Sequence, residues 1–230
     1  TGGLGNQMFQ YAFGVAASLE NGIPFALDLY NFGKEGPKYT QRSYELYHFN
    51  IQVKVASESE CAPFHTKKAW IFRKIKERLG RNTDHIFNPH ALKVKDGDYL
   101  QGLWQSEKYF KKYAKTIRHE LTLKESFGAE ALSVAQDIEL KKKGGIATIL
   151  VHIRRGDFVT NNASLSLLGV LGGNYFTDGV EEIFSKLKLV NPDIKTHIYI
   201  ATEDVEWVSK NIKFHHEVTY ISRPGIYDFE

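Results

Sequence analysis

The segment ILVHIRRGDF at residues 149–158 places two arginines and an aspartate directly after an apolar, β-branched run. A guanidinium presents fixed N–H donors that match phosphate oxygens in pairs, so Arg154 and Arg155 suit a phosphate or a diphosphate. Asp157 could orient one of these arginines or bind a sugar hydroxyl. A structural ion pair between Arg155 and Asp157 on a surface turn is the alternative interpretation.

Three further polar residues follow a second apolar run. Thr202, Glu203 and Asp204 come directly after IYIA at residues 198–201. Ligands of open parallel sheets bind beyond the carboxyl ends of the strands, so we expect both polar groups to lie at one edge of a sheet. The sequence therefore predicts an anion-binding site built from the ends of two strands.

The segment GGLGNQ at residues 2–7 is a second candidate for binding an anion. Closely spaced glycines before a helix let backbone N–H groups and the helix dipole face a negative charge. Gly3 and Gly5 begin the dinucleotide-binding pattern, but Met8 occupies its third glycine position, and Asp28 follows at about the distance of a ribose-binding acid. A tight turn that only positions the helix is the alternative.

The second half of the chain alternates between strand and helix patterns. This alternation is typical of βαβ units and predicts a parallel sheet. The near-continuous apolar run of its first strand predicts burial on both faces. The expected elements are a strand at 146–153, a helix at 175–188, a strand at 197–201, a helix at 205–210 and a strand at 217–222.

The first half is less regular. It opens with an amphipathic helix, for which Asn6 is the expected N-cap and Asn21-Gly22 the expected end. Further elements are expected as a strand at 25–29, a basic helix at 64–79, a strand at 99–104 and a helix at 130–143. The glycine pair after this last helix predicts a boundary between domains at 1–144 and 145–230.

Composition limits the class of protein. The chain has 230 residues, a formal net charge of +3 and a single cysteine, Cys61. One cysteine excludes an internal disulfide and indicates a cytoplasmic, reducing setting, and we expect Cys61 to be structural because no Cys-His signature surrounds it. No apolar run reaches the roughly 20 residues of a membrane-spanning helix. Because the first residue is Thr1, we expect this chain to be part of a longer protein whose second domain continues.

The motif GGLGNQMFQYAFG together with VHIRRGDF resembles the bacterial α-1,2-fucosyltransferases, which are inverting enzymes that use GDP-fucose. The blocks YLQGLWQSEKYF and IYIATEDVEW are similar to further parts of that family. The resemblance implies an α/β fold of the GT-B type, with two Rossmann-like halves, parallel sheets and a cleft between the halves. In that family the C-terminal half holds the nucleotide, so residues 1–144 would form the acceptor side.

The resemblance also implies roles for single residues. Arg154 matches the arginine that contacts the donor diphosphate in enzymes with the His-x-Arg-Arg-x-Asp pattern, and Asp157 and Asn6 are the other residues expected to act in catalysis. The residues expected to bind the donor are His152, Arg154, Arg155, Gly3, Gly5, Gln7, Thr202, Glu203 and Asp204. The partners implied are GDP-fucose and a galactose-terminated oligosaccharide or lipid-linked glycan.

No cofactor and no metal are expected, because two arginines already neutralise a diphosphate. Asp96-Gly97-Asp98 matches the Asp-x-Asp pattern by which other glycosyltransferases hold a divalent cation. Asp-Gly is also a favoured turn dipeptide, so we interpret this segment as a turn before a strand.

Two other functions are open on the residues alone. An NAD-dependent oxidoreductase would rest on the glycine loop and Asp28, but it leaves the arginines unexplained. A non-catalytic module for a membrane or nucleic acid would rest on the basic segment at 66–81, which carries an apolar stripe of Trp70, Ile71, Ile75 and Leu79. We expect no nucleic-acid partner. Peripheral contact with the inner membrane face would suit an enzyme whose acceptor is lipid-linked.

Overall fold

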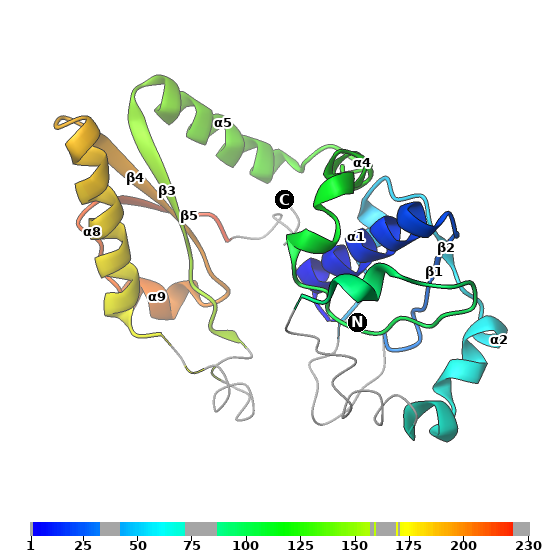
Figure 1. Cartoon of the computed structure of the whole chain (residues 1–230). Coiled ribbons are helices and arrows are strands. Elements are labelled where there is room, and N and C mark those ends of the chain that lie inside the picture. Colours follow the sequence, from blue (N-terminus) through cyan, green and yellow to red (C-terminus); the bar gives the residue numbers. More distant parts are fainter. Residues whose placement is uncertain are drawn as a thin grey trace. The chain divides into compact units, whose positions relative to one another are not determined.

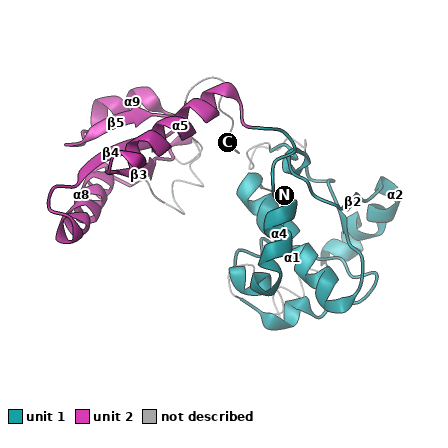
Figure 2. Ribbon diagram, turned by 90° about the horizontal axis from the view of Figure 1, so that it is seen from above, with its two compact units in different colours: residues 1–126 teal, residues 127–230 magenta. Residues whose placement is uncertain are grey.

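The computed structural model describes residues 2–32, 42–71, 87–156, 159, 169 and 171–222. The chain forms two compact units, residues 1–126 and 127–230, which Figure 2 shows in two colours. Both units combine helices with parallel strands. The expectation of an α/β fold with parallel sheets is therefore confirmed.

The first unit is built around helix α1, Leu4–Asn21, drawn in dark blue in Figure 1. All seven residues from Tyr11 to Ala17 are buried, because this stretch is apolar all round and other segments cover it on every side. The helix ends as expected at Gly22, whose φ of 66° is a left-handed conformation that glycine adopts without strain.

The other elements of the first unit are short. Strand β1, Ala26–Leu27, pairs in parallel with β2, Lys54–Val55. Further helices include α2, Glu58–Cys61, and α4, Ala114–Glu120, and the 3-10 turns are η1, Leu46–His48; η2, Ala62–His65; η3, Pro89–Leu92; η4, Glu107–Tyr109; and η5, Lys111–Tyr113.

The strand expected at 99–104 is wrong. No residue of this segment is in a strand, and Trp104 has a φ of 54°, which an extended strand does not contain. The Trp104 ring instead stacks on Phe13 of α1, with ring centres 4.0 Å apart and planes 7° from parallel. Tyr109 meets the Phe13 ring edge-on at 5.2 Å. Aromatic packing on α1 therefore holds this segment, rather than a strand ladder.

The second unit contains a three-stranded parallel sheet in the order β3-β4-β5. Its strands are β3, Ile146–His152; β4, Lys195–Ala201; and β5, Glu217–Tyr220. Helix α8, Gly173–Val190, connects β3 to β4, and α9, Val205–Asn211, connects β4 to β5. The expected order of strands and helices is confirmed in this half of the chain.

Helices cover both faces of this sheet (Figure 1). On one face, the alternate strand residues Ile149, Val151, Ile198 and Ile200 form a core with residues of α8 and α9. On the other face lies α5, Ala129–Lys143, which confirms the helix expected at 130–143. The Tyr199 hydroxyl donates to Asp137 of α5 at 2.6 Å. This helix belongs to the second unit, so the units divide at 126/127 and not at the expected 144/145.

Burial of β3 on both faces is wrong for the described part of the chain. Leu150 is 65% exposed and His152 is also exposed, whereas Ile149 and Val151 are buried. Strand β3 is an edge of the described sheet, and α5 leaves the Leu150 side chain open. The apolar run therefore predicted correctly that this segment is a strand, but it predicted the position of the strand within the sheet wrongly.

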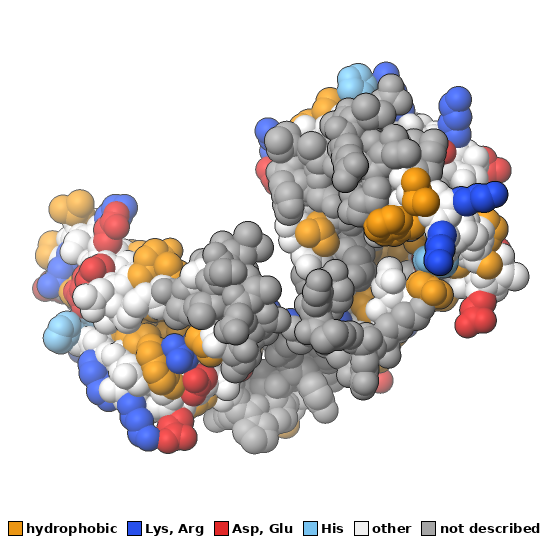
Figure 3. Space-filling view, turned by 90° about the horizontal axis from the view of Figure 1, so that it is seen from below, with side chains coloured by type: hydrophobic (Ala, Val, Ile, Leu, Met, Phe, Trp, Pro, Cys, Tyr) orange, Lys and Arg blue, Asp and Glu red, His pale blue; other side chains and the backbone are white. Residues whose placement is uncertain are grey.

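Charged side chains are spread over the surface. Figure 3 shows single Lys and Arg side chains on the described surface of both units, with acidic side chains among them. Of the basic segment at 66–81, residues 67–71 are helical, with Trp70 and Ile71 more than half exposed, and residues 72–81 lie outside the described residues. Among the helices that the structure describes, none is long and apolar enough to cross a membrane.

Candidate functional site

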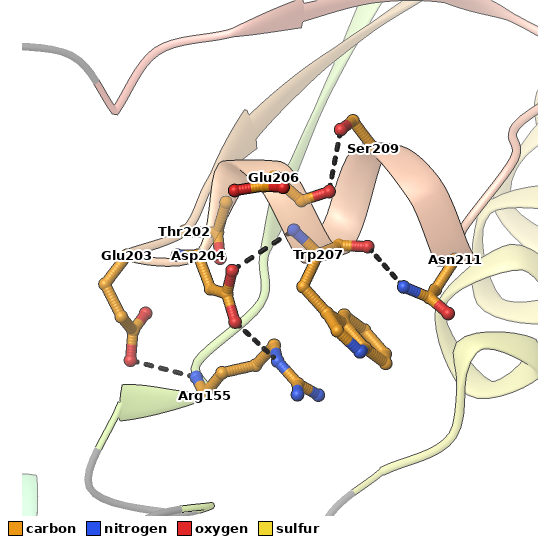
Figure 4. Close-up of polar contacts among 8 residues, drawn as sticks. All are labelled: Arg155, Thr202, Glu203, Asp204, Glu206, Trp207, Ser209 and Asn211. Carbon is orange, nitrogen blue, oxygen red and sulfur yellow. Dashed lines mark hydrogen bonds and ion pairs between the residues drawn. The ribbon is translucent and has the colours of Figure 1, made fainter.

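The carboxyl ends of β3 and β4 meet at one edge of the sheet of the second unit. His152 pairs with Ala201 in the parallel ladder, and the Ile153 N–H extends the pairing by donating to the Ala201 carbonyl at 2.8 Å. This register brings Arg155 beside Thr202, Glu203 and Asp204 (Figure 4). The two polar groups that the sequence singled out therefore lie together.

Arg155 is fixed by contacts on two sides. Its Nε donates to Oδ2 of Asp204 at 3.1 Å, and its guanidinium carbon lies 3.4 Å from the centre of the Trp207 ring. The side chain is only 14% exposed. An arginine that lies flat on an indole gains about 0.5–2 kcal/mol from the ring, depending on how dry the contact is. Asp204 thus takes the role that the sequence offered to Asp157, which lies outside the described residues.

Asp204 also begins helix α9. Its Oδ1 accepts a hydrogen bond from the Trp207 N–H at 3.1 Å, as an N-cap aspartate does. The Asp204 N–H donates to the Thr202 hydroxyl. Thr202 is buried, and its own N–H donates to the Ser222 hydroxyl at 2.7 Å. One carboxylate therefore joins the helix start, Trp207 and Arg155 into a rigid turn.

Glu203 holds the backbone where β3 ends. Its Oε1 accepts a hydrogen bond from the Arg155 N–H at 2.9 Å. A Cβ atom on Gly156 would lie 2.7 Å from that oxygen, so a side chain there would push the carboxylate away. Sequence reasoning gave Gly156 no role. The close contact comes from a residue that follows a different strand, which the sequence alone does not show.

His152 and Arg154 lie on either side of Ile153 at the end of β3. Both side chains are exposed, whereas Ile153 between them is buried in the core. The edge of the sheet therefore presents one arginine to solvent beside a second that is fixed. Such an arrangement can bind phosphate oxygens with little loss of side-chain freedom, because the neighbouring cation is already ordered.

The glycine loop of the first unit opens α1 without a side-chain cap. The helix begins at Leu4 with Gly3 as its N-cap, so the expectation that Asn6 is the N-cap is wrong. The Asn6 amide oxygen instead accepts a hydrogen bond from Gln105 at 2.6 Å. Among the described residues, no atom outside the helix's own backbone lies within 4 Å of a Cβ built on Gly3 or Gly5. In this part of the chain these glycines therefore leave space beside the first turn, where backbone N–H groups have no partner within a helix.

Gln7 is a buried anchor in the same turn. Its Nε2 donates to the carbonyls of Gly2 at 3.0 Å and Ser43 at 2.8 Å, and its Oε1 accepts from the Glu45 N–H at 2.9 Å. The side chain is 2% exposed. The amide thus joins the glycine loop to the segment at 43–45, which explains why a polar residue lies inside an apolar helix.

Comparisons with known proteins agree over nearly the whole chain. The model of glycosyl transferase family 11 matches residues 1–227. The chain is 28% identical over 221 residues to an α-1,2-colitosyltransferase of Escherichia coli, an alignment that covers 91% of this chain and 69% of that protein. It is 27% identical over 255 residues to the O-antigen biosynthesis glycosyltransferase WbnK of Escherichia coli, covering 99% of this chain and 76% of the relative. No solved structure matches the chain with significance.

Proposed function

Because the chain belongs to glycosyl transferase family 11, we propose that it transfers fucose from GDP-fucose to a galactose hydroxyl of a glycan, with inversion and in α-1,2 linkage. The broader statement, that it is a glycosyltransferase acting on glycans, rests directly on the family and on two relatives that are named glycosyltransferases. The oxidoreductase and the non-catalytic binding module are thereby wrong as interpretations of the sequence.

The observation that carries the proposal is the pair of arginines at the end of β3. When the bond between fucose and GDP breaks, negative charge grows on the β-phosphate. A cationic donor aimed at that oxygen stabilises the transition state more than the bound substrate, which lowers the barrier. Arg154, exposed beside the fixed Arg155, is the residue we assign to this task.

The neighbouring polar residues would serve the same donor in different ways. His152 is exposed beside Arg154 and would contact the nucleotide directly. Arg155 would act chiefly through its charge, because Asp204 and Trp207 already hold its guanidinium. The role of Thr202, Glu203 and Asp204 would be to hold the end of β3, and with it the arginines, in place. Asp157 stays a proposed catalytic residue from the motif alone.

In the first unit, the open start of α1 would bind part of the substrates. Among the described residues there is space beside Gly3 and Gly5, where a ligand would meet the N–H groups of the first helical turn. Asn6, on the same turn, would contact the reacting sugars, and Gln7 would hold the loop in shape from beneath. We propose that residues 127–230 form the nucleotide-binding half and residues 1–126 the acceptor half of a GT-B enzyme. The parallel sheets of both units support this.

A second donor sugar is favoured by one of the relatives, which is named an α-1,2-colitosyltransferase. Colitose is fucose without the 3-hydroxyl group. An enzyme that hydrogen-bonds this hydroxyl would reject the deoxy sugar strongly, because its polar partner would be left unpaired. An enzyme shaped for colitose would discriminate much less.

Transfer assays with the two donors test both proposals. GDP-fucose and GDP-colitose would be supplied with a β-galactoside acceptor, and the product linkage determined by NMR. We expect an α-1,2-linked fucosyl product and a higher kcat/KM with GDP-fucose. A higher kcat/KM with GDP-colitose would replace fucose by colitose in the proposal, and a product with another linkage would reject the α-1,2 assignment.

A further inference from the structure

A group of metal-binding side chains lies in the first unit, apart from the arginines and the glycine loop. Among the described residues, Asp28, Cys61 and His65 have ligand atoms within 4.8 Å of one another. Asp28 follows directly on β1, Cys61 ends α2, and His65 ends η2. We propose that these three residues bind a zinc ion that fastens the end of β1 to the α2–η2 segment.

The spacing of two of the ligands suits a shared ion. Helix α2 continues directly into the 3-10 turn η2, and this segment brings the Cys61 Sγ and a His65 ring nitrogen within 4.8 Å of each other. Asp28 reaches them from the end of β1, and its Oδ2 lies 2.6 Å from the His65 Nε2. Tetrahedral zinc with bonds of about 2.0–2.3 Å separates its ligand atoms by roughly 3.5 Å. Small side-chain rotations therefore convert the observed cluster into a coordination sphere.

Neighbouring groups orient two of the ligands as partners of metal ligands do. The Tyr99 hydroxyl donates to Oδ2 of Asp28 at 2.6 Å, and the Tyr30 N–H donates to Oδ1 at 2.8 Å. The Tyr30 ring stacks on the imidazole of His65, with centres 3.8 Å apart and planes 16° from parallel. Both the carboxylate and the imidazole are thus held before any ion arrives.

The charge and the chemistry of the donor set favour zinc. A carboxylate, a thiolate and a neutral imidazole together carry two negative charges, which a divalent cation balances. Thiolate and imidazole ligands select zinc over magnesium and calcium, which prefer oxygen. Asp28 and His65 are each 14% exposed, which leaves a path for the ion and a fourth position for water.

Without a metal, the pKa of Asp28 and the pKa of Cys61 are shifted in opposite directions. Burial raises the pKa of Asp28, but hydrogen bonds from Tyr99, the Tyr30 backbone and His65 outweigh it and lower the pKa, so the carboxylate is anionic. Burial, and then the charge of Asp28, raise the pKa of the Cys61 thiol. Metal binding would therefore release the thiol proton.

Cobalt spectroscopy on untagged, chelator-treated protein tests the site. Cys61 is the only cysteine of the chain, so a thiolate-to-cobalt charge-transfer band can arise from no other residue. We expect this band, together with intense tetrahedral d–d bands that saturate at one Co²⁺ per chain and disappear when Zn²⁺ is added. A wild-type spectrum without a thiolate band would overturn the proposal, whatever the variants do.

Variants then identify the other ligands. Cys61→Ser should remove the charge-transfer band, and His65→Ala and Asp28→Asn should each abolish tight binding. Tyr99→Phe should weaken metal binding about 10–100-fold, because it removes a partner of a ligand. His90→Ala, at an exposed histidine outside the cluster, is the matched control and should bind as the wild type does. Zn²⁺ bound equally well by Cys61→Ser and the wild type would also overturn the proposal.

Discussion

The guanidinium of Arg155 lies flat on the ring of Trp207, 3.4 Å from its centre, while its neighbour Arg154 is exposed at the end of the same strand. Two adjacent arginines of one motif therefore have different surroundings. Arg155 is part of the folded structure of the turn, and Arg154 is exposed at its surface. This difference predicts that substitutions of the two will have different effects.

Replacing Arg154 should abolish transfer and leave the fold intact. Loss of a donor to a developing oxyanion typically costs about a hundredfold or more in rate. Arg154→Lys should also be slow, because an ammonium does not reproduce the paired donors of a guanidinium. Turnover and melting temperature would be measured on the same preparations. Near-normal turnover of Arg154→Ala with an unchanged melting temperature would reject this residue as the phosphate ligand.

Replacing Arg155 should instead lower stability. Arg155→Ala removes both the contact with Trp207 and the ion pair with Asp204, which is partly solvent-screened at 38% exposure of the aspartate. We expect a loss of about 1–2 kcal/mol in the free energy of unfolding, from the cation–π contact and one charged hydrogen bond. A double-mutant cycle with Trp207→Leu measures the coupling. Strictly additive effects would show that the stacking contributes nothing.

Gly156 and Glu203 should be coupled in the same turn. Gly156→Ala places a methyl group where the Glu203 carboxylate lies, at 2.7 Å from Oε1, so the carboxylate must leave the Arg155 N–H. The loss of stability should be small, because Glu203 is a flexible, exposed side chain that can move aside. The loss of turnover should be larger, because the backbone of Arg154 shifts together with that of Arg155. Glu203→Ala alone should cost about as much as the double variant. A double variant much worse than either single one would contradict this explanation.

Glycine can serve to leave space for a ligand or to adopt a positive φ, and variants of Gly5 and Gly22 distinguish these two roles. In Gly5→Val the added Cβ meets no atom of another described segment within 4 Å, so the variant should fold but lose turnover if a ligand approaches the start of α1. Gly22→Val is the control, because a β-branched residue is strained at a φ of 66°. That variant should lose melting temperature and keep the activity of its folded fraction. Full activity of Gly5→Val would reject the proposed approach of a substrate to this turn.

The sequence predicted the second unit much better than the first. Strand β3 contains the apolar run at 149–151 and β4 the apolar run at 198–201, and loop residues flank each helix, so local patterns predict the order of β3, α8, β4, α9 and β5. In the first unit, long-range contacts override the local pattern. YLQGLW resembles a strand, but Trp104 stacks on Phe13 and has a positive φ, which a strand does not contain.

The sites were also hard to predict, because their residues contact others that are far away in the sequence. The arginine motif was visible, but the contact of Arg155 with Trp207 joins two strand–helix connections and was not. Cys61 and His65 are four residues apart, a signal that could have been noticed. Asp28 joins them only through the fold, and so the cluster as a whole was not foreseen.

The last prediction concerns metals in the reaction itself. Asp96-Gly97-Asp98 forms the expected turn, with Gly97 at a φ of 81° and the Asp98 carboxylate accepting a hydrogen bond from the Lys95 N–H at 2.8 Å. A cation that assists transfer must lie beside the diphosphate, and we propose that Arg154 neutralises that group instead. Transfer at a temperature well below melting should therefore survive excess EDTA. The double variant with Asp96→Asn and Asp98→Asn should change turnover little, because an asparagine oxygen still accepts the hydrogen bond.

Chelation should nevertheless affect the protein in one measurable way. If zinc binds Asp28, Cys61 and His65, EDTA should lower the melting temperature of the wild type but not that of Cys61→Ser. Following turnover and melting together distinguishes the two roles of a metal. A loss of turnover without any change in melting, restored by Mn²⁺ and not by Zn²⁺, would mean that a cation and not Arg154 neutralises the leaving phosphate. A loss of both, restored by Zn²⁺, would place the requirement in the fold of the first unit and leave the arginine mechanism as proposed.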